Sequence, residues 1–305
     1  MTNPQAAEAM EVRAGGTDLT ERRRSGISTG EVHDIAPNPA LTTIAWNGDG
    51  SARIGCLVTI DKIASDAKLA LAYPGLSAAA AGLATPQVRR VGTIGGNLLQ
   101  RTRCWYYRSP QTSCLKKGGD DCPARAGNHL YGVIFDRGPC VAPHPSTMAA
   151  ALLAYEARVT TSLRTALAID TIYGDGSDGR VDHLLAPGEM LNHVDLPPPL
   201  TGERATYQRT ISRAHAEWPL VEVIARVSIK NGVIDFARVA VGGVAPVPMR
   251  LTQVERALTG ATADTATCAA ASKRAIEGAT ALPRTGYKLQ LLQGSVLDAL
   301  TKVVA

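Results

Sequence analysis

Apolar residues recur along this 305-residue chain with the periods typical of strands and of helices. The pattern predicts short elements in the first half of the chain and longer ones in the second half. Strands are expected at 11–13, 53–60, 91–94, 157–163, 205–212, 220–230 and 233–244. Helices are expected at 19–24, 61–68, 75–84, 146–157, 251–259, 262–281 and 287–304. Pro86 limits the third of these helices, and Ser146 is expected to cap the fourth.

Strands are followed by helices in the second half, and the proline run at 197–199 is the clearest linker. This order predicts an α+β protein. The segment 101–140 interrupts the pattern, because it is polar, rich in Gly and Pro, and without periodicity. An irregular stretch of that length inside a compact domain is expected to be held by something other than a hydrophobic core.

Four cysteines lie in this irregular region: Cys104, Cys114, Cys122 and Cys140. Four thiolates suit either zinc or an iron–sulfur cluster, and unligated cysteines are a third alternative. The spacings of nine, seven and 17 residues lack the Cys-x2-Cys pairs of many structural zinc sites, which counts against zinc but does not decide. Clustering of this kind favours metal binding over disulfides.

Two glycine turns precede the cysteines. Residues 14–19 read Ala-Gly-Gly-Thr-Asp-Leu, and residues 93–98 read Thr-Ile-Gly-Gly-Asn-Leu. Glycines let successive N–H groups converge on a phosphate, although for the first motif taken alone an ordinary strand-to-helix turn is the favoured interpretation. Neither turn is a Gly-x-Gly-x-x-Gly motif, so a nicotinamide-binding fold is not supported. Two such turns are expected to hold one dinucleotide from both sides.

Composition narrows the function further. The formal net charge of +5 is small for this length, and no long basic block or aromatic-basic pattern indicates nucleic-acid binding. The sequence has no run of about 18 apolar residues, so a membrane span is not predicted. Residues 1–10 lack a signal peptide, so the protein is expected in the cytoplasm, or in the periplasm if a partner subunit carries the export signal.

The two glycine turns resemble the FAD-binding turns of flavoprotein subunits in the xanthine dehydrogenase, or molybdenum hydroxylase, family. The stretch 95–108, which runs from the second turn through Cys104, resembles the flavin subunit of bacterial aldehyde oxidoreductases of the periplasmic aldehyde oxidase type. In that group an inserted loop carries a [4Fe-4S] cluster. The resemblance extends through Cys140 to the His-Pro-Ser segment that begins at His144.

The resemblance implies a two-lobed FAD-binding domain of the p-cresol methylhydroxylase type at 1–196, with the cluster loop at about 101–145. A CO dehydrogenase flavoprotein-like C-terminal domain is expected at 200–305. It implies that the four cysteines bind the [4Fe-4S] cluster. The residues expected to bind FAD are Ala14, Gly15, Gly16, Thr17, Asp18, Leu19, Thr93, Gly95, Gly96, Asn97, Arg101, Thr102, His144, Leu191 and Arg209.

Leu191 is expected on the adenine side, and Arg209 stands where the family often has a lysine near the flavin. The chain departs from the family at Thr147, where an aspartate usually contacts FAD, so that contact is expected to be lost or replaced. No catalytic residue is assigned, because the substrate would be oxidised on another subunit.

The resulting hypothesis is an electron-transfer subunit of an aldehyde oxidoreductase. A large partner would hold the molybdenum cofactor, a small partner [2Fe-2S] clusters, and electrons would leave through FAD to an external acceptor. One alternative is a zinc-stabilised assembly module without redox function. Another is the flavin subunit of a molybdenum hydroxylase acting on N-heterocycles, CO or hydroxybenzoyl-CoA.

Overall fold

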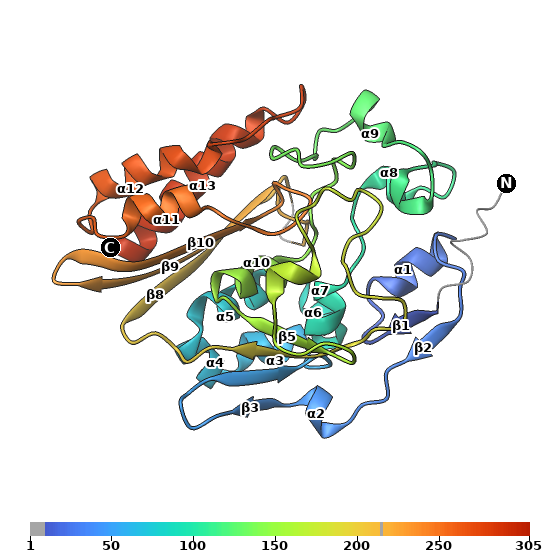
Figure 1. The fold of residues 1–305 in the computed structure, drawn as a ribbon, viewed down its shortest axis with the longest axis horizontal. Coiled ribbons are helices and arrows are strands. Elements are labelled where there is room, and N and C mark those ends of the chain that lie inside the picture. Colours follow the sequence, from blue (N-terminus) through green and yellow to red (C-terminus); the bar gives the residue numbers. More distant parts are fainter. Residues whose placement is uncertain (1–9, 214–215) are drawn as a thin grey trace.

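A computed structural model describes residues 10–213 and 216–305. Three sheets organise the chain: a two-stranded parallel pair, a five-stranded antiparallel sheet and a four-stranded antiparallel sheet. Figure 1 shows the four-stranded sheet and its helices at the upper left, the five-stranded sheet and its helices below them, and the parallel pair at the right. The mixed helix and strand content confirms the predicted α+β class.

The first lobe is a small βαβ unit. Strands β1 (Glu11–Arg13) and β2 (Val32–Asp34) pair in parallel, and helix α1 (Leu19–Arg24) connects them. Gly16 lies between β1 and α1 with φ of 69°, a left-handed conformation that favours glycine. The predicted strand and helix are confirmed here.

The second lobe contains the five-stranded sheet, whose strand order is β3-β4-β7-β5-β6. Its strands are β3 (Ile44–Trp46), β4 (Ala52–Gly55), β5 (Arg158–Thr161), β6 (Leu167–Ala168) and β7 (Leu191–Leu196). Its helices are α2 (Pro39–Thr42), α3 (Ile60–Ser65), α4 (Ala67–Ala72), α5 (Pro74–Gly82), α6 (Pro86–Val91), α7 (Ile94–Leu98) and α10 (Thr147–Ala154), with a 3-10 helix at Ile169–Ile172. Every residue of α10 is buried, so this helix is the centre of the lobe's core.

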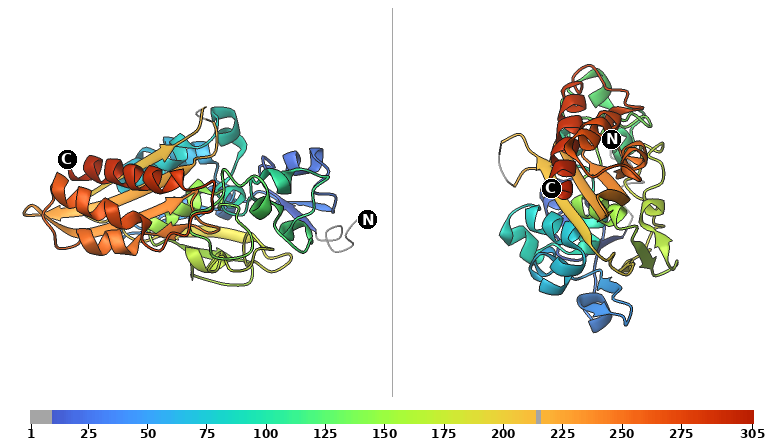
Figure 2. Two further views of the ribbon diagram at one scale, coloured as in Figure 1. Left: turned by 90° about the horizontal axis from the view of Figure 1, so that it is seen from above. Right: turned by 90° about the vertical axis from the view of Figure 1, so that its left-hand side faces the viewer.

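The C-terminal part is a four-stranded sheet of order β11-β10-β9-β8, covered on one face by helices (Figure 2). The strands are β8 (Glu203–Thr210), β9 (Val221–Lys230), β10 (Val233–Gly242) and β11 (Met249–Arg250). The helices are α11 (Thr252–Leu258), α12 (Thr265–Ser272), a 3-10 helix at Lys273–Ile276 and α13 (Tyr287–Val304). Helices α5 and α10 pack against strands of this sheet, which joins it to the second lobe.

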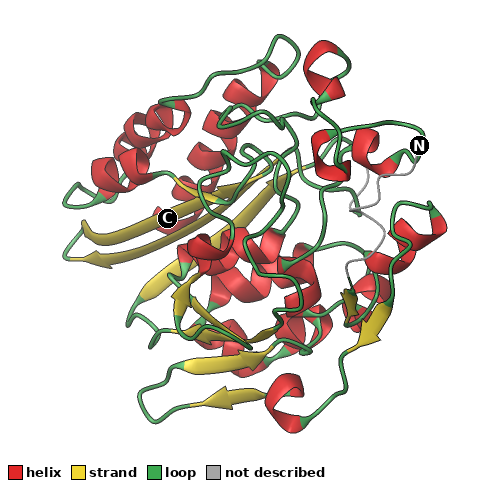
Figure 3. Ribbon diagram, turned by 45° about the vertical axis from the view of Figure 1, so that its right-hand side comes forward, coloured by secondary structure: helices red, strands yellow, loops and turns green. Residues whose placement is uncertain are grey.

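The cysteine segment, residues 101–145, contains only short helices: α8 (Trp105–Arg108), a 3-10 turn at Leu115–Lys117 and α9 (Pro123–Ala126). The rest of the segment is loop, as Figure 3 shows. Its own buried apolar clusters are small: one consists of Leu115, Cys140 and Ala142, and the other of Ala124, Val133 and Val141. The prediction of an irregular segment with little core is confirmed.

Several predicted boundaries were wrong. The strand expected at 91–94 does not form, because Thr85 caps a helix that begins at Pro86 and Thr93 caps the next one. Gly95 and Gly96 therefore lie inside the one-turn helix α7. The strand expected at 53–60 ends at Gly55, and the helix expected at 262–281 is confined to α12 and the 3-10 turn. Helix 287–304 and the Ser146 cap are confirmed.

Candidate functional site

The two glycine turns meet at the junction of the first and second lobes. A Cβ atom on Gly15 would lie 1.9 Å from the carbonyl oxygen of Val91, at the end of α6, so only glycine allows this approach. Gly95 packs on Cys56 of the second lobe, where a Cβ atom would lie 3.0 Å from the cysteine backbone and side chain. These two glycines are therefore required by packing between segments far apart in sequence.

Gly96 differs from Gly15 and Gly95, because a Cβ atom added to it would meet only the Thr93 hydroxyl, at 3.1 Å. That hydroxyl accepts a hydrogen bond from the Gly96 N–H at 3.1 Å and caps α7. The face of α7 at Gly96 thus stays open to a ligand. Asn97 is held from the other side, because its Oδ1 accepts a hydrogen bond from the Ser146 hydroxyl at 2.7 Å.

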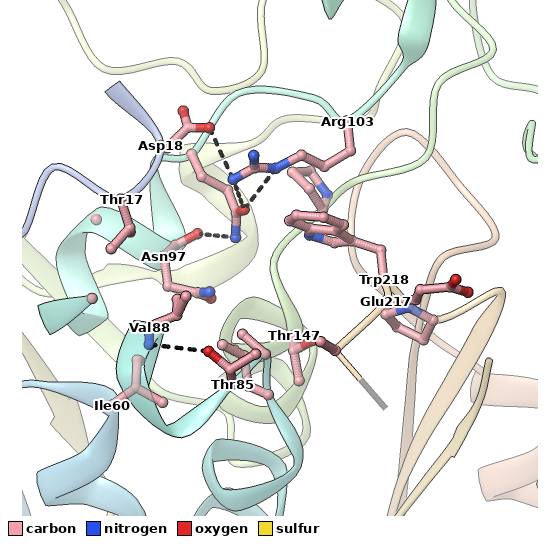
Figure 4. A pocket seen from close by; sticks show the side chains of 18 of the residues that line it. Thr17, Asp18, Ile60, Thr85, Val88, Asn97, Arg103, Thr147, Glu217 and Trp218 are labelled. Carbon is pink, nitrogen blue, oxygen red and sulfur yellow. Dashed lines mark hydrogen bonds and ion pairs between the residues drawn. The ribbon is translucent and has the colours of Figure 1, made fainter. Parts of the chain in front are cut away.

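Two cavities lie along the turns and share Thr17, Asp18, Thr93, Gly96 and Gln100. The first cavity, of about 240 Å³, extends toward the four-stranded sheet (Figure 4). Its lining includes Ile60, Leu83, Val88, Thr147 and Arg209. The second cavity, of about 110 Å³, extends toward β7. Its lining includes Ala14, Gly15, Leu19, Gly95 and Leu191.

Together the two cavities form an elongated groove that suits an extended ligand with its middle at the glycine turns. The two glycine turns line its centre, and apolar side chains such as Leu83 and Leu191 lie toward its ends, the distribution expected for a pyrophosphate between two ring systems. Twelve of the fifteen predicted FAD-binding positions line this groove, and Arg101, Thr102 and His144 do not. The residues present therefore fit a dinucleotide such as FAD.

The twelve predicted positions that line the groove are Ala14, Gly15, Gly16, Thr17, Asp18, Leu19, Thr93, Gly95, Gly96, Asn97, Leu191 and Arg209.

Asp18 lines the groove, but its carboxylate is already paired. It accepts hydrogen bonds or ion pairs from Arg22 at 3.2 Å, Arg103 at 2.9 Å and Arg108 at 2.7 Å. Burial raises the pKa of Asp18, but the guanidinium groups of Arg103 and Arg108 outweigh burial and hold that pKa below its usual value. Asp18 therefore ties the first glycine turn to the cysteine segment, a role that the sequence analysis did not identify.

Arg101 and Thr102 point away from the groove. The Arg101 side chain pairs with Asp182 at 2.5 Å, while its backbone N–H donates to Asp18 at 3.1 Å. Thr102 is 1% exposed, lines the cavity between the cysteines, and accepts a hydrogen bond from the Cys104 N–H at 3.3 Å. Both residues therefore interact within the cysteine segment and its surroundings rather than with the groove.

Thr147, where the family usually has aspartate, donates a hydrogen bond to Glu222 Oε2 at 2.8 Å. The Tyr207 hydroxyl donates to the same oxygen at 2.9 Å. Glu222 is 1% exposed, and burial raises its pKa above the usual value, although Thr147 and Tyr207 act in the opposite direction. The carboxyl group near this end of the groove is therefore that of Glu222 on β9, and Thr147 binds it.

Arg209 lines the first cavity from β8, opposite Glu222 in the strand register. Its terminal nitrogens donate to the carbonyl oxygens of Gly82 and Glu217. Its Nε atom is buried and has no hydrogen-bond partner among the described residues. Arg213 lies beyond the end of β8 with 88% of its side chain exposed.

The four cysteines line one small cavity, which also includes Thr102, Leu115 and Lys116. All are free thiols; Cys114 and Cys140 are buried, and Cys104 and Cys122 are partly buried. In the described part of the chain, no three His, Cys, Asp or Glu side chains lie close enough to hold a single metal ion. Within this cavity the side chains of Cys122 and Cys140 lie within hydrogen-bond reach of each other.

A buried ion-pair cluster supports the cysteine cavity from outside. Asp182, whose side chain is 6% exposed, pairs with Arg101 at 2.5 Å and with Lys116 at 2.9 Å. Burial raises the pKa of Asp182, but the two cations more than offset this and hold it far below the usual value. The cluster joins three loops that have little apolar contact with one another.

His144 lies outside the glycine-turn groove. It lines a third cavity, of about 440 Å³, which adjoins the first cavity through Arg103, Pro145 and Trp218. Its ring packs edge-on against Tyr173, with the ring centroids 4.4 Å apart. The sequence analysis named His144 but did not identify this cavity, because the other side chains that line it come from distant parts of the chain.

Comparison with known protein families agrees with this geometry. Residues 4–199 match the family model described as the FAD binding domain in molybdopterin dehydrogenase. Residues 206–303 match the CO dehydrogenase flavoprotein C-terminal domain. No helix in the described residues is long and apolar enough to cross a membrane.

Two relatives are similar in sequence. The aldehyde oxidoreductase FAD-binding subunit PaoB of Escherichia coli (strain K12) is 35% identical over 246 residues, which cover 78% of this chain and 76% of that protein. The xanthine dehydrogenase FAD-binding subunit of Escherichia coli O157:H7 is 36% identical over 103 residues, 32% of each chain.

Solved structures share the fold at lower identity. Quinoline 2-oxidoreductase from Pseudomonas putida 86 matches with a TM-score of 0.71 and 20% identity, covering 97% of this chain and 89% of that one. Carbon monoxide dehydrogenase from Hydrogenophaga pseudoflava matches with a TM-score of 0.73 and 22% identity, covering 98% and 91%. The predicted family is confirmed: the chain belongs to the FAD-binding subunits of the xanthine dehydrogenase, or molybdenum hydroxylase, family.

Proposed function

We propose that this chain is the electron-transfer subunit of an aldehyde-oxidising complex. A large partner subunit would hold the molybdenum cofactor, and a small one would hold [2Fe-2S] clusters. The observation that carries the proposal is the direct connection of the glycine-turn groove to the four-cysteine cavity through residues 98–104. The similarity to a relative named as an aldehyde oxidoreductase subunit supports aldehydes as the substrate class.

FAD, when bound, supplies the two-electron chemistry, and the chain supplies binding and orientation. Gly96, whose face is open, would leave room for the pyrophosphate, and the backbone of Gly15 and Gly16 would line the opposite side of it. Leu191 would contact the adenine in the second cavity, and Arg209 would lie at the flavin end in the first. Asn97, whose Oδ1 is held by the Ser146 hydroxyl, would line the groove beside the bound dinucleotide.

The four cysteines would bind a [4Fe-4S] cluster. A zinc ion with four thiolates needs sulfur atoms about 3.8 Å apart, given Zn–S bonds of about 2.3 Å. In an iron–sulfur cluster each thiolate binds a different iron, so the sulfur atoms lie further apart. Cys104, Cys114, Cys122 and Cys140 line one cavity, and among the described residues no three His, Cys, Asp or Glu side chains are placed for a single metal ion, which supports the cluster over zinc.

Metal analysis of the purified complex, combined with a substitution, tests the cluster. Cys122→Ser is expected to remove the iron that this chain would add to the complex, about four atoms per chain. Cys268→Ala is the matched control, because Cys268 is buried in the C-terminal domain among residues of another core. Stoichiometric zinc in place of iron, lost in Cys122→Ser, would favour the assembly-module alternative.

Extraction of FAD and a steady-state assay test the rest of the proposal. The intact complex is expected to release one FAD per chain and to reduce an external acceptor with aldehydes faster than with N-heterocycles, CO or hydroxybenzoyl-CoA. A complex without extractable FAD contradicts the electron-transfer role. Preference for one of the other substrates contradicts only the aldehyde assignment.

A further inference from the structure

The third cavity is the largest of those described above and has no role in the proposed FAD site. It lies between the cysteine segment, the end of the four-stranded sheet and α13. Its lining is largely apolar, from residues such as Ala124, Val141, Ala142 and Pro143. A volume of about 440 Å³ with a few polar groups is typical of sites for small molecules.

Lys288 brings a buried positive charge to this cavity. The residue is 1% exposed, and its Nζ donates to the carbonyl oxygens of Tyr131 at 3.1 Å and Gly243 at 2.9 Å. An ammonium group has three N–H donors, so one has no partner among the described residues. Burial lowers the pKa of Lys288 to about 7, since no carboxylate in the described chain compensates it. A ligand with an acceptor oxygen would satisfy this group.

His144 adds a second unpaired donor. Its Nδ1 accepts a hydrogen bond from the Ser146 N–H at 3.3 Å, and burial lowers the His144 pKa to about 3. The imidazole is therefore neutral with its proton on Nε2. That Nε2 is buried and has no partner in residues 10–213 and 216–305. An unsatisfied buried donor costs about 1–3 kcal/mol, which a bound acceptor would recover.

Aromatic side chains form the mouth of the cavity. Trp105 and Tyr131 both line it, with ring centroids 5.4 Å apart and exposures of 45% and 43%. Half-exposed aromatic rings beside a hydrophobic cavity suit the faces of a planar ring. The cavity thus combines flat apolar contacts at its mouth with two buried donors.

We propose that the third cavity binds a small planar quinone, which accepts the electrons of the complex. Lys288 and His144 would donate hydrogen bonds to the quinone carbonyl oxygens, and Trp105 and Tyr131 would contact the ring. The quinone takes up two electrons, delivered by substrate oxidation through this chain, and two protons from water, and becomes a hydroquinone. The inference rests on the proposed electron-transfer function and adds the class of acceptor.

Equilibrium binding to the oxidised complex tests the site without turnover. Calorimetry with 1,4-naphthoquinone is expected to show binding that weakens about ten-fold in Lys288→Met, because a hydrogen bond to a charged group is lost. The ratio of naphthoquinone to ferricyanide reduction is expected to fall by a similar factor. Lys302→Met is the matched control: it lies on the same helix, is exposed, and bonds to Gln208 away from the cavity.

A second variant covers the case in which Lys288→Met does not fold. Trp105→Ala changes a half-exposed side chain at the mouth and is expected to weaken naphthoquinone binding several-fold. Equal affinity in the wild type and both variants overturns the inference, as does tight binding of 2-naphthoate with none of naphthoquinone. An FAD-containing complex that reduces ferricyanide but does not bind naphthoquinone refutes the quinone site alone. A complex without FAD refutes the proposed function itself.

Discussion

The glycine turns and the cysteine segment are neighbours, but different interactions hold them in place. The turns are fixed by close backbone packing, as at Gly15 and Val91, and by helix caps such as Thr93. The cysteine segment has two small apolar clusters and also depends on ion pairs of Asp18 and Asp182. The groove is therefore expected to be sensitive to side-chain volume, whereas the cysteine segment is expected to be sensitive to charge.

Removal of the Asp182 charge is expected to have the largest effect. Asp182→Asn leaves Arg101 and Lys116 without their carboxylate and should lower the free energy of unfolding by about 4 kcal/mol. Chemical denaturation measures the loss, and limited proteolysis should show cleavage first within 101–145. Asp235→Asn, which removes an exposed pair with Lys230, should change neither measurement. Proteolysis that begins at the glycine turns would contradict the comparison.

A side chain added at Gly15 is expected to have the next largest effect, and this effect should be on the groove. Gly15→Val places a side chain against the Val91 carbonyl and should cost about 3 kcal/mol, with loss of most bound FAD. Gly294→Ala serves as control, because nothing lies within 4 Å of its added Cβ. Thermal unfolding and the ratio of FAD to protein measure both effects. Full FAD occupancy in Gly15→Val would show that the turn tolerates displacement.

The smallest expected effect concerns Glu222 and depends on pH. Because burial raises the pKa of Glu222, the folded state binds its proton more tightly than the unfolded state. Stability should therefore fall as pH rises from the ordinary glutamate pKa, about 4.3, through the higher folded value. Glu222→Gln should remove that decline and gain about 1 kcal/mol at the upper end. Denaturation from pH 4 to pH 8 measures the difference, and parallel curves would contradict it.

Local signals were sufficient for much of the fold. The apolar period of 287–304 and the Ser146 cap correctly predicted α13 and the start of α10. The same signals failed at 91–94, because a short apolar run does not distinguish a strand from the end of a capped helix. The family itself was predicted from the glycine turns and the stretch that follows them.

Long-range contacts could not be predicted from the sequence. Thr147 was recognised as a departure, but its partner Glu222 lies 75 residues away on β9. Asp18 was assigned to FAD, while its partner Arg108 lies 90 residues further along the chain. The third cavity depends on Lys288 and Tyr131, which are separated by 157 residues. Pairings of this kind follow from topology rather than from local pattern.

The position of Lys288 also has a consequence for synthesis of the protein. The ribosome completes residues 14–98, which form the glycine turns, long before it reaches α13. Domains generally fold as units, with N-terminal ones first during translation. The bonds from Lys288 to Tyr131 and Gly243 can form only after residue 288 has left the exit tunnel. A nascent chain would therefore complete its dinucleotide groove only after Arg209 has emerged, and would close the third cavity last.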